Sequence, residues 1–186
     1  ESALYEALAR NVPIGGTSAG LAILGDYDFS ALNDTILSSE ALSNPYDPRI
    51  TLDGRFVSER DFRAEHKGQK SPLTLLTNTL TDSHFQQRDR MGRLLTFVAR
   101  LDADGSVRDA ASLGIGINEQ TALLVEPSGI GRVVGNPYSK KPAESLQQRS
   151  VFFLDTNIVA SSPLNTPLAF PNMQIVRATY DPKTGL

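Results

Sequence analysis

The chain has 186 residues, 40% of them hydrophobic and 21% charged, which suffices for one domain with a substantial core. A net charge of −3 gives no basic signal for nucleic acid and no polybasic tail for a membrane surface, and no apolar run reaches the length of a transmembrane helix. The absence of cysteine excludes disulfides, thiolate metal sites and cysteine nucleophiles, and leaves the cellular compartment open. With only two histidines, His66 and His84, we expect no metal.

The first part of the chain is predicted to contain one helix, one strand and a sharp turn. Apolar residues at helical spacing predict a helix over Glu1–Arg10, and the apolar run Val12–Ile14 predicts a short strand. The glycine-rich segment Gly16–Gly20 follows, and Leu21–Leu24 continues it as a helix. Further along, we expect a polar loop over Gly25–Tyr46 with helical turns around Ser38–Leu42, a turn at Asp53-Gly54, and an exposed charged segment at Ser58–Lys70 that contains His66.

The remainder of the chain alternates between strand and helix patterns. Leu73–Thr77 is predicted as a strand, Asp82–Phe85 lies at a strand end, and a helix runs from about Gln86 to Leu101, closed by Asp104-Gly105. The later strands are expected at Gly114–Ile117, Thr121–Val125, a hairpin with its second strand at Gly129–Gly135, Val151–Leu154 and Gln174–Ala178. This pattern predicts a single α/β domain over residues 1–186, with an open, mostly parallel sheet flanked by helices.

The predicted turn at Gly16–Gly20 comes early in the chain for this type of fold. In an open α/β sheet, the strand that leads to such a turn is usually internal and has neighbours on both edges. We therefore expect the sheet to be completed by an upstream segment, with this chain as the C-terminal portion of a longer precursor, or by a companion chain. A homodimer is left open.

Ser18 is the candidate nucleophile. It lies between small residues in Gly16–Gly20, at a predicted strand-to-helix junction, which is the pattern of a nucleophile elbow. The backbone N–H groups of Gly16 and Ala19 are the candidate oxyanion donors. The alternative is a glycine-rich turn with an incidental serine.

A serine nucleophile needs a base and an acid that orients the base. His84 is preferred over His66 because it follows a predicted strand, where active-site residues collect in open α/β sheets, whereas His66 lies in a charged loop. Glu119 is the preferred orienting acid, since it follows the glycine-rich strand Gly114–Ile117. Asp82 is the competitor, but it is only two residues from His84. For each residue, the alternative is a surface or structural role.

Three arginines follow the candidate base: Arg88, Arg90 and Arg93. Guanidinium groups bind carboxylates bidentately, so such a cluster beside His84 predicts a pocket for acidic groups. The alternative is a solvated basic helix face, which is what most runs of charge are.

Three blocks together resemble the signature segments of the cyanophycinases. They are Gly16–Gly20, Asp82–Leu94 and Gly114–Glu119, and their order and residue types agree over most of the first 125 residues. Cyanophycinases belong with dipeptidase E among the serine peptidases of the flavodoxin-like, three-layer α/β fold. Two positions depart from the family pattern: Ser83 stands where glutamine is common, and Asn118 stands where aspartate is usual.

The resemblance implies a serine peptidase that hydrolyses cyanophycin, a poly-aspartate backbone with arginine on its β-carboxyls, to β-aspartyl-arginine dipeptides. It implies a triad of Ser18, His84 and Glu119 that needs no cofactor. It also implies substrate-binding roles for Asp82, Ser83, Arg88, Arg90 and Arg93.

Three alternatives remain. The chain could be a related peptidase for β-aspartyl or acidic dipeptides, or a non-catalytic module that binds acidic peptides. An α/β-hydrolase esterase is disfavoured, because its triad runs in the order serine, acid, histidine, whereas the favoured order here is Ser18, His84, Glu119.

Overall fold

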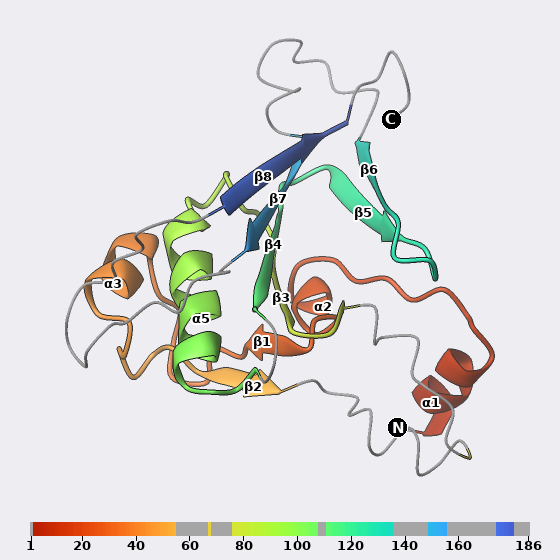
Figure 1. The fold of residues 1–186 in the computed structure, drawn as a ribbon, viewed down its shortest axis with the longest axis horizontal. Coiled ribbons are helices and arrows are strands. Elements are labelled where there is room, and N and C mark those ends of the chain that lie inside the picture. Colours follow the sequence, from red (N-terminus) through yellow and green to blue (C-terminus); the bar gives the residue numbers. More distant parts are fainter. Residues whose placement is uncertain are drawn as a thin grey trace.

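The structure, a computed structural model, describes residues 2–54, 67, 76–107, 111–135, 149–155 and 174–180. The described helices all lie before residue 104, and the described elements after them are strands (Figure 1). In chain order they are α1 (Ser2–Ala9), α2 (Ala19–Ala22), β1 (Tyr27–Phe29), α3 (Ser38–Ser43), β2 (Leu52–Gly54), β3 (Thr79–Asp82), α5 (Met91–Ala103), β4 (Leu113–Ile117), β5 (Thr121–Val125), β6 (Gly131–Gly135), β7 (Ser150–Asp155) and β8 (Gln174–Thr179).

Six strands form one mixed sheet in the order β2-β1-β3-β4-β7-β8. The central strands β1, β3 and β4 are parallel, and β2 and β7 run antiparallel to their neighbours β1 and β4. Because β8 is antiparallel to β7, it runs in the direction of β4, so β1, β3, β4 and β8 share one direction. The predicted α/β fold with a mostly parallel sheet is confirmed in this sense. Strands β5 and β6 form a separate antiparallel hairpin.

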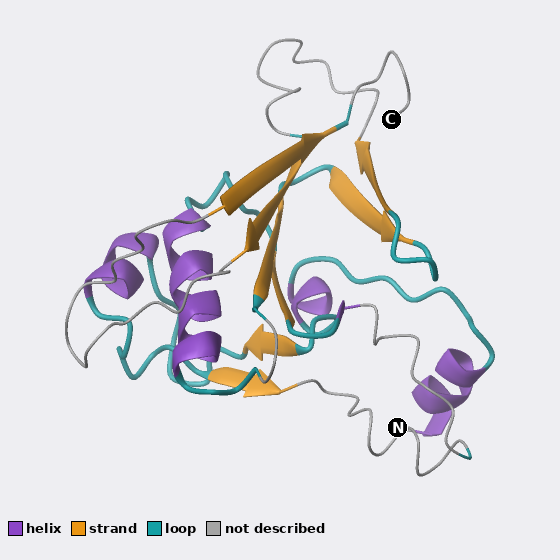
Figure 2. Cartoon of the chain, in the orientation of Figure 1, coloured by secondary structure: helices purple, strands orange, loops and turns teal. Residues whose placement is uncertain are grey.

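Helices lie on both faces of the sheet (Figures 1 and 2). On one face, α5 and α3 bury an apolar core that includes Leu94, Phe97 and Val98. Gly114 in β4 allows α5 to approach closely, because a Cβ there would lie 3.1 Å from Val98 and 3.2 Å from Leu94. On the other face, Ile115 and Ile117 pack with Leu21 of α2. The sheet is therefore the middle of three layers.

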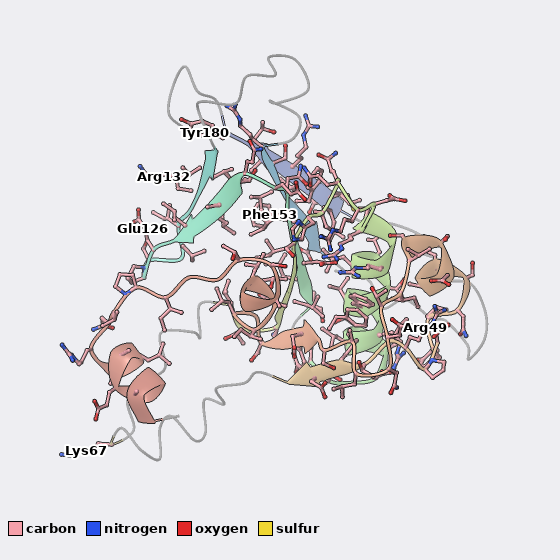
Figure 3. The ribbon with its side chains drawn as sticks, turned by 180° about the vertical axis from the view of Figure 1, so that it is seen from behind. Arg49, Lys67, Glu126, Arg132, Phe153 and Tyr180 are labelled. Atoms are coloured by element: carbon pink, nitrogen blue, oxygen red, sulfur yellow. The ribbon has the colours of Figure 1, made fainter. Side chains whose placement is uncertain are left out.

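Several predicted elements are confirmed. The N-terminal helix corresponds to α1, the turns around Ser38 correspond to α3, and the strands expected after Gly114 correspond to β4 through β8. Figure 3 shows Glu126 and Arg132 on the β5–β6 hairpin, on the opposite side of the molecule from Arg49, which lies beside α3.

Two predicted strands are wrong in position. Val12–Ile14 forms no strand, since none of the described strands pairs with it and a strand exists only within a hydrogen-bonded ladder. The strand expected at Leu73–Thr77 is found at Thr79–Asp82, and Leu76 and Thr77 form a helical turn before it. Residues 73–75 lie outside the described residues.

The start of the long helix and the loop at Gly25–Tyr46 also require correction. The helix begins at Met91 rather than near Gln86, because Asp89 adopts a φ of 48°, which is incompatible with a helix interior. Within the expected loop, Tyr27–Phe29 forms β1 and pairs with β2, so Asp53-Gly54 lies in a strand and not in a turn. His66 and the charged segment around it, except Lys67, lie outside the described residues.

None of the helices in the described segments is long and apolar enough to cross a membrane. The same segments contain no group of three or more histidine or acidic side chains arranged to hold a metal ion.

Candidate active site

Ser18 has an unusual backbone conformation immediately before α2. Its φ of 54° and ψ of −122° are strained for a residue with a side chain. The turn depends on Gly16, because a Cβ at that position would lie 1.8 Å from the carbonyl oxygen of Gly20. Thr81 of β3 donates a 2.8 Å hydrogen bond to the carbonyl of Leu21, which fastens α2 to the sheet. The local sequence therefore holds Ser18 at the end of a sharp turn, with its side chain accessible.

His84 and Glu119 follow two neighbouring parallel strands, β3 and β4. Because parallel strands end at the same edge of a sheet, the two side chains meet there. His84 Nδ1 lies 2.7 Å from Glu119 Oε1, and His84 Nε2 lies 3.3 Å from Ser18 Oγ. The structure thus brings together the three residues singled out as nucleophile, base and orienting acid. An imidazole in this position can accept a proton from the serine while its other nitrogen donates to the carboxylate.

A cavity of about 620 Å³ opens beside these three side chains. Ser83, Gly16 and Asn118 also line it, together with a wall from β5. The His84 side chain is 24% exposed and that of Glu119 is 47% exposed, so the pair lies at the mouth of the cavity and not in the core. Ser18 is likewise accessible from solvent.

Asp82 is buried in an ion cluster with two of the three arginines. Arg93 binds it bidentately, with Nε at 2.7 Å and Nη2 at 2.7 Å, and Arg90 Nη1 lies 2.9 Å from the same carboxylate. Arg93 also lies over the rings of Phe29 and Phe97 on the α5 face. Burial lowers the pKa of the Arg90 guanidinium, Asp82 opposes this change, and the neighbouring arginines add to it. The cluster attaches the start of α5 to the end of β3.

The three arginines are therefore not equivalent. Arg93 is 6% exposed and fully engaged with Asp82. Arg90 also donates 2.9 Å to the carbonyl of Ser83, beside His84. Arg88 is exposed, and its backbone N–H donates 3.0 Å to the carbonyl of His84. None of the three is among the described residues that line the cavity. The expected arginine-lined pocket is not formed by the described part of the chain.

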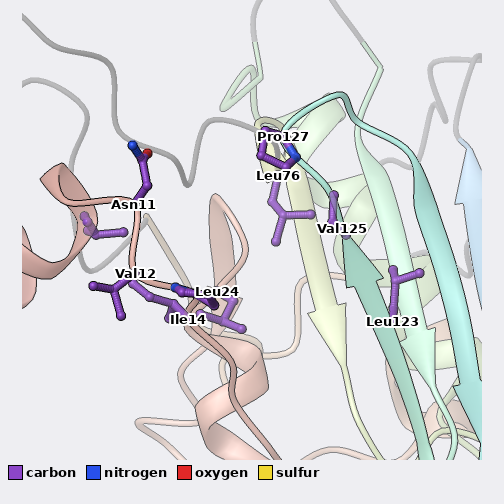
Figure 4. Close-up of a pocket in the computed structure, with 10 residues that line it drawn as sticks. Asn11, Val12, Ile14, Leu24, Leu76, Leu123, Val125 and Pro127 are labelled. Carbon is purple, nitrogen blue, oxygen red and sulfur yellow. The ribbon is translucent and has the colours of Figure 1, made fainter.

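A second, apolar groove of about 290 Å³ adjoins the cavity (Figure 4). It runs between the segment after α1 and strand β5, and shares Ile14, Leu24 and Leu123 with the cavity. Val12 and Ile14 on its wall are 45% and 36% exposed. This groove was not predicted from the sequence, because the apolar run Val12–Ile14 predicts a strand inside a sheet.

The fold and this site define an α/β protein with an aligned serine, histidine and glutamate at the edge of its central sheet. The chain is similar to two curated proteins named cyanophycinase, from Synechococcus elongatus and Thermosynechococcus vestitus. Each is 26% identical over 162 residues, which cover 87% of this chain and 38% of the relative. The expected likeness to cyanophycinases is confirmed, and the chain spans about two fifths of the length of these relatives. No model of a protein family matches the chain.

Proposed function

We propose that this chain carries the active site of a serine peptidase that hydrolyses cyanophycin. The observation that carries the proposal is the line of hydrogen-bonding atoms from Ser18 Oγ through the His84 ring to Glu119, with contacts of 3.3 Å and 2.7 Å. The likeness to two proteins named cyanophycinase supports the substrate class. The strained backbone of Ser18 supports a nucleophile elbow.

The proposed reaction begins when Ser18 Oγ attacks the carbonyl carbon of the scissile amide. His84 Nε2 takes the hydroxyl proton, and Glu119 accepts the hydrogen bond from Nδ1–H and stabilises the imidazolium. When the tetrahedral intermediate collapses, His84 gives that proton to the leaving amine, which leaves an ester on Ser18. His84 then takes a proton from a water molecule, which attacks the ester carbonyl. When this second intermediate collapses, the acid is released and His84 returns the proton to Ser18 Oγ.

The developing oxyanion needs hydrogen-bond donors beside Ser18. Ala19 is the first residue of α2, so its N–H has no partner within the helix and is available at the base of the turn. We assign it as one oxyanion donor, in the position that follows the nucleophile. Gly16, which lines the cavity, is the second proposed donor.

We assign the substrate contacts unevenly among the predicted residues. Arg88 is the exposed arginine, so it is the best placed to bind an aspartyl carboxylate that extends beyond the cavity. Ser83 lines the cavity and Arg90 donates to its carbonyl, whereas Asp82 and Arg93 form a buried ion pair that supports this segment. The proposed products are β-aspartyl-arginine dipeptides. We further propose that an upstream segment, a companion chain or a second copy covers the apolar groove.

The test is incubation of the purified chain with insoluble cyanophycin granules, with the released dipeptide identified by mass. Ser18→Ala should lower turnover by roughly 10³-fold or more while the fold is retained. Ser39→Ala, on the exposed side of α3, is the matched control and should leave turnover unchanged. Near-normal activity of Ser18→Ala would rule out the proposed nucleophile. Labelling of Ser18 by a fluorophosphonate would separate an enzyme from a module that only binds acidic peptides.

A further inference from the structure

The loop after His84 and the loop after β4 are joined by a set of side-chain amide contacts. The side-chain oxygen of Asn118 accepts a 3.0 Å hydrogen bond from the Gln86 backbone N–H, and its Nδ2 donates 2.6 Å to Gln86 Oε1. The Glu119 backbone N–H donates 3.2 Å to Gln87 Oε1. We call the side chains of Gln86, Gln87 and Asn118 the amide clamp.

The amide clamp joins the loop that carries His84 to the loop that carries Glu119. Gln86 is two residues after His84, and Asn118 directly precedes Glu119, so each half of the clamp is tied to one catalytic candidate. Asn118 is 2% exposed, and its backbone N–H donates 3.1 Å to the carbonyl of Ser150 in β7, which fixes the clamp to the sheet. On the other side, Phe85 N–H donates 3.2 Å to the carbonyl of Ile117.

The loop that carries His84 needs such support because its backbone is strained. His84 has a φ of 49°, in the left-handed region that non-glycine residues rarely adopt. Glu119 is 47% exposed, so packing alone does not hold its carboxylate. Displacement of a catalytic group by about 1 Å can cost ~100-fold in rate.

We propose that the amide clamp is the device that sets the distance between the His84 ring and the Glu119 carboxylate, with Asn118 and Gln86 as positioning residues. The inference rests on the proposed function, since it treats these two groups as base and orienting acid. The Asn118 amide suits this clamp because it provides an acceptor for the Gln86 N–H and a donor for Gln86 Oε1.

The test compares Gln86→Ala, Asn118→Ala, the double variant and Asn118→Asp. Gln86 is exposed, so its truncation should leave the fold intact, which keeps the proposal testable if Asn118→Ala fails to fold. Each single variant should lower kcat by ~10- to 100-fold with little change in KM, because substrate contacts are retained. The double variant should be no worse than the more severe single variant. Asn118→Asp should recover most of the rate, since a rotated Gln86 amide can donate to the new carboxylate.

Asn33→Ala is the matched control, because that amide makes an ordinary loop hydrogen bond of 2.8 Å to the carbonyl of Pro48, far from the site. Unchanged kcat in Gln86→Ala, additive losses in the double variant, or an effect confined to KM would each overturn the clamp. The rate of fluorophosphonate labelling of Ser18 is measured in parallel. A wild-type chain that is labelled but does not cleave cyanophycin would reject the proposed substrate, whereas slower labelling of the variants would still support the clamp.

Discussion

At the scale of single residues, an unusual backbone conformation positions the side chains of the candidate nucleophile and the candidate base. Ser18 and His84 both have positive φ; Ser18 lies in the turn before α2, and His84 lies in the loop after β3. Such strain persists only where the surroundings enforce it. Around Ser18 the enforcing feature is the close passage of Gly16 against Gly20, and around His84 it is the network that joins the loop to Asn118 and Ile117.

The two glycines of the Ser18 turn should respond differently to substitution. Gly16→Ala would put a Cβ at 1.8 Å from the Gly20 carbonyl oxygen, so the turn must open and Ser18 must move away from His84. Gly20→Ala meets nothing within 4 Å, and should be tolerated or slightly stabilising, by ~0.5–1 kcal/mol, as alanine in a helix. Fluorophosphonate labelling and urea unfolding of both variants check this. Equal labelling of the two would show that the close contact does not control the turn.

At the scale of elements, the Asp82 cluster attaches α5 to the sheet. Asp82 ends β3, Arg90 immediately precedes α5, and Arg93 lies in the first turn of α5. The ion pairs therefore fix the position of α5 relative to β3, in addition to the apolar contacts between the helix and the sheet. From the sequence, all three arginines are expected to bind substrate. The structure shows that two of them bind Asp82, which the helix pattern did not reveal because Asp82 ends β3, nine positions before α5 begins.

Loss of the buried pair should be expensive. Arg93→Met leaves the Asp82 carboxylate, with a side chain 8% exposed, without its bidentate partner, and should lower the free energy of unfolding by ~3–5 kcal/mol. Arg132→Met is the control, because that side chain is 54% exposed and 3.9 Å from Glu126, and its effect should be below ~0.5 kcal/mol. Urea unfolding measures both. Similar midpoints for the two variants would contradict the structural role of Arg93.

The loop after α3 should contribute acid-sensitive stability. Side-chain and backbone hydrogen bonds from Arg49 lower the pKa of Asp47 from 3.8 to about 2. A carboxyl with a lowered pKa stabilises the folded state above its ordinary pKa, and this contribution is lost as the pH falls through the folded value. Asp47→Asn should therefore be less stable than the wild type above pH 3.8, with the difference vanishing near pH 2. A stability difference that does not change with pH, followed by urea unfolding, would refute this.

At the scale of the whole molecule, the face around the apolar groove is incompletely covered. Val12 and Ile14, on the wall of the groove, and Ile23 in the segment after the Ser18 turn are between 36% and 47% exposed. Exposed apolar residues are characteristic of interaction surfaces where they form a patch. This agrees with our proposal that another segment or chain covers the groove.

The exposed face should bind an apolar dye. The double variant Val12→Ser/Ile14→Ser should reduce the fluorescence of an anilinonaphthalene sulfonate dye with the wild-type chain, because it makes the groove wall polar. Leu32→Ser, at an apolar residue that is 75% exposed elsewhere, is the control and should leave the signal nearly unchanged. If the wild-type chain bound no dye, or if both variants reduced the signal equally, the groove would not be the interaction surface.

Much of the fold could be predicted from local patterns, and the errors share a physical cause. Strands β4 through β8 and helices α1 and α3 were predicted because their patterns of apolar residues, or their turn residues, are local. The strand expected at Val12–Ile14 was wrong because strand formation depends on a partner elsewhere, and the start of α5 was wrong because the His84 loop overrides the helix pattern with a left-handed residue at Asp89.

The sequence by itself determined the α/β class and the candidates Ser18, His84 and Glu119, because small residues around a serine and polar residues after strands are local signals. Only the tertiary structure decided which groups meet. It brought Ser18 and His84, which are 66 positions apart in the sequence, to a 3.3 Å contact. It also paired Arg90 and Arg93 with Asp82, and joined Gln86 to Asn118. The physical reason is that parallel strands bring distant segments to one sheet edge. The neighbours of a residue at that edge come from other parts of the chain, so its local sequence pattern does not predict them.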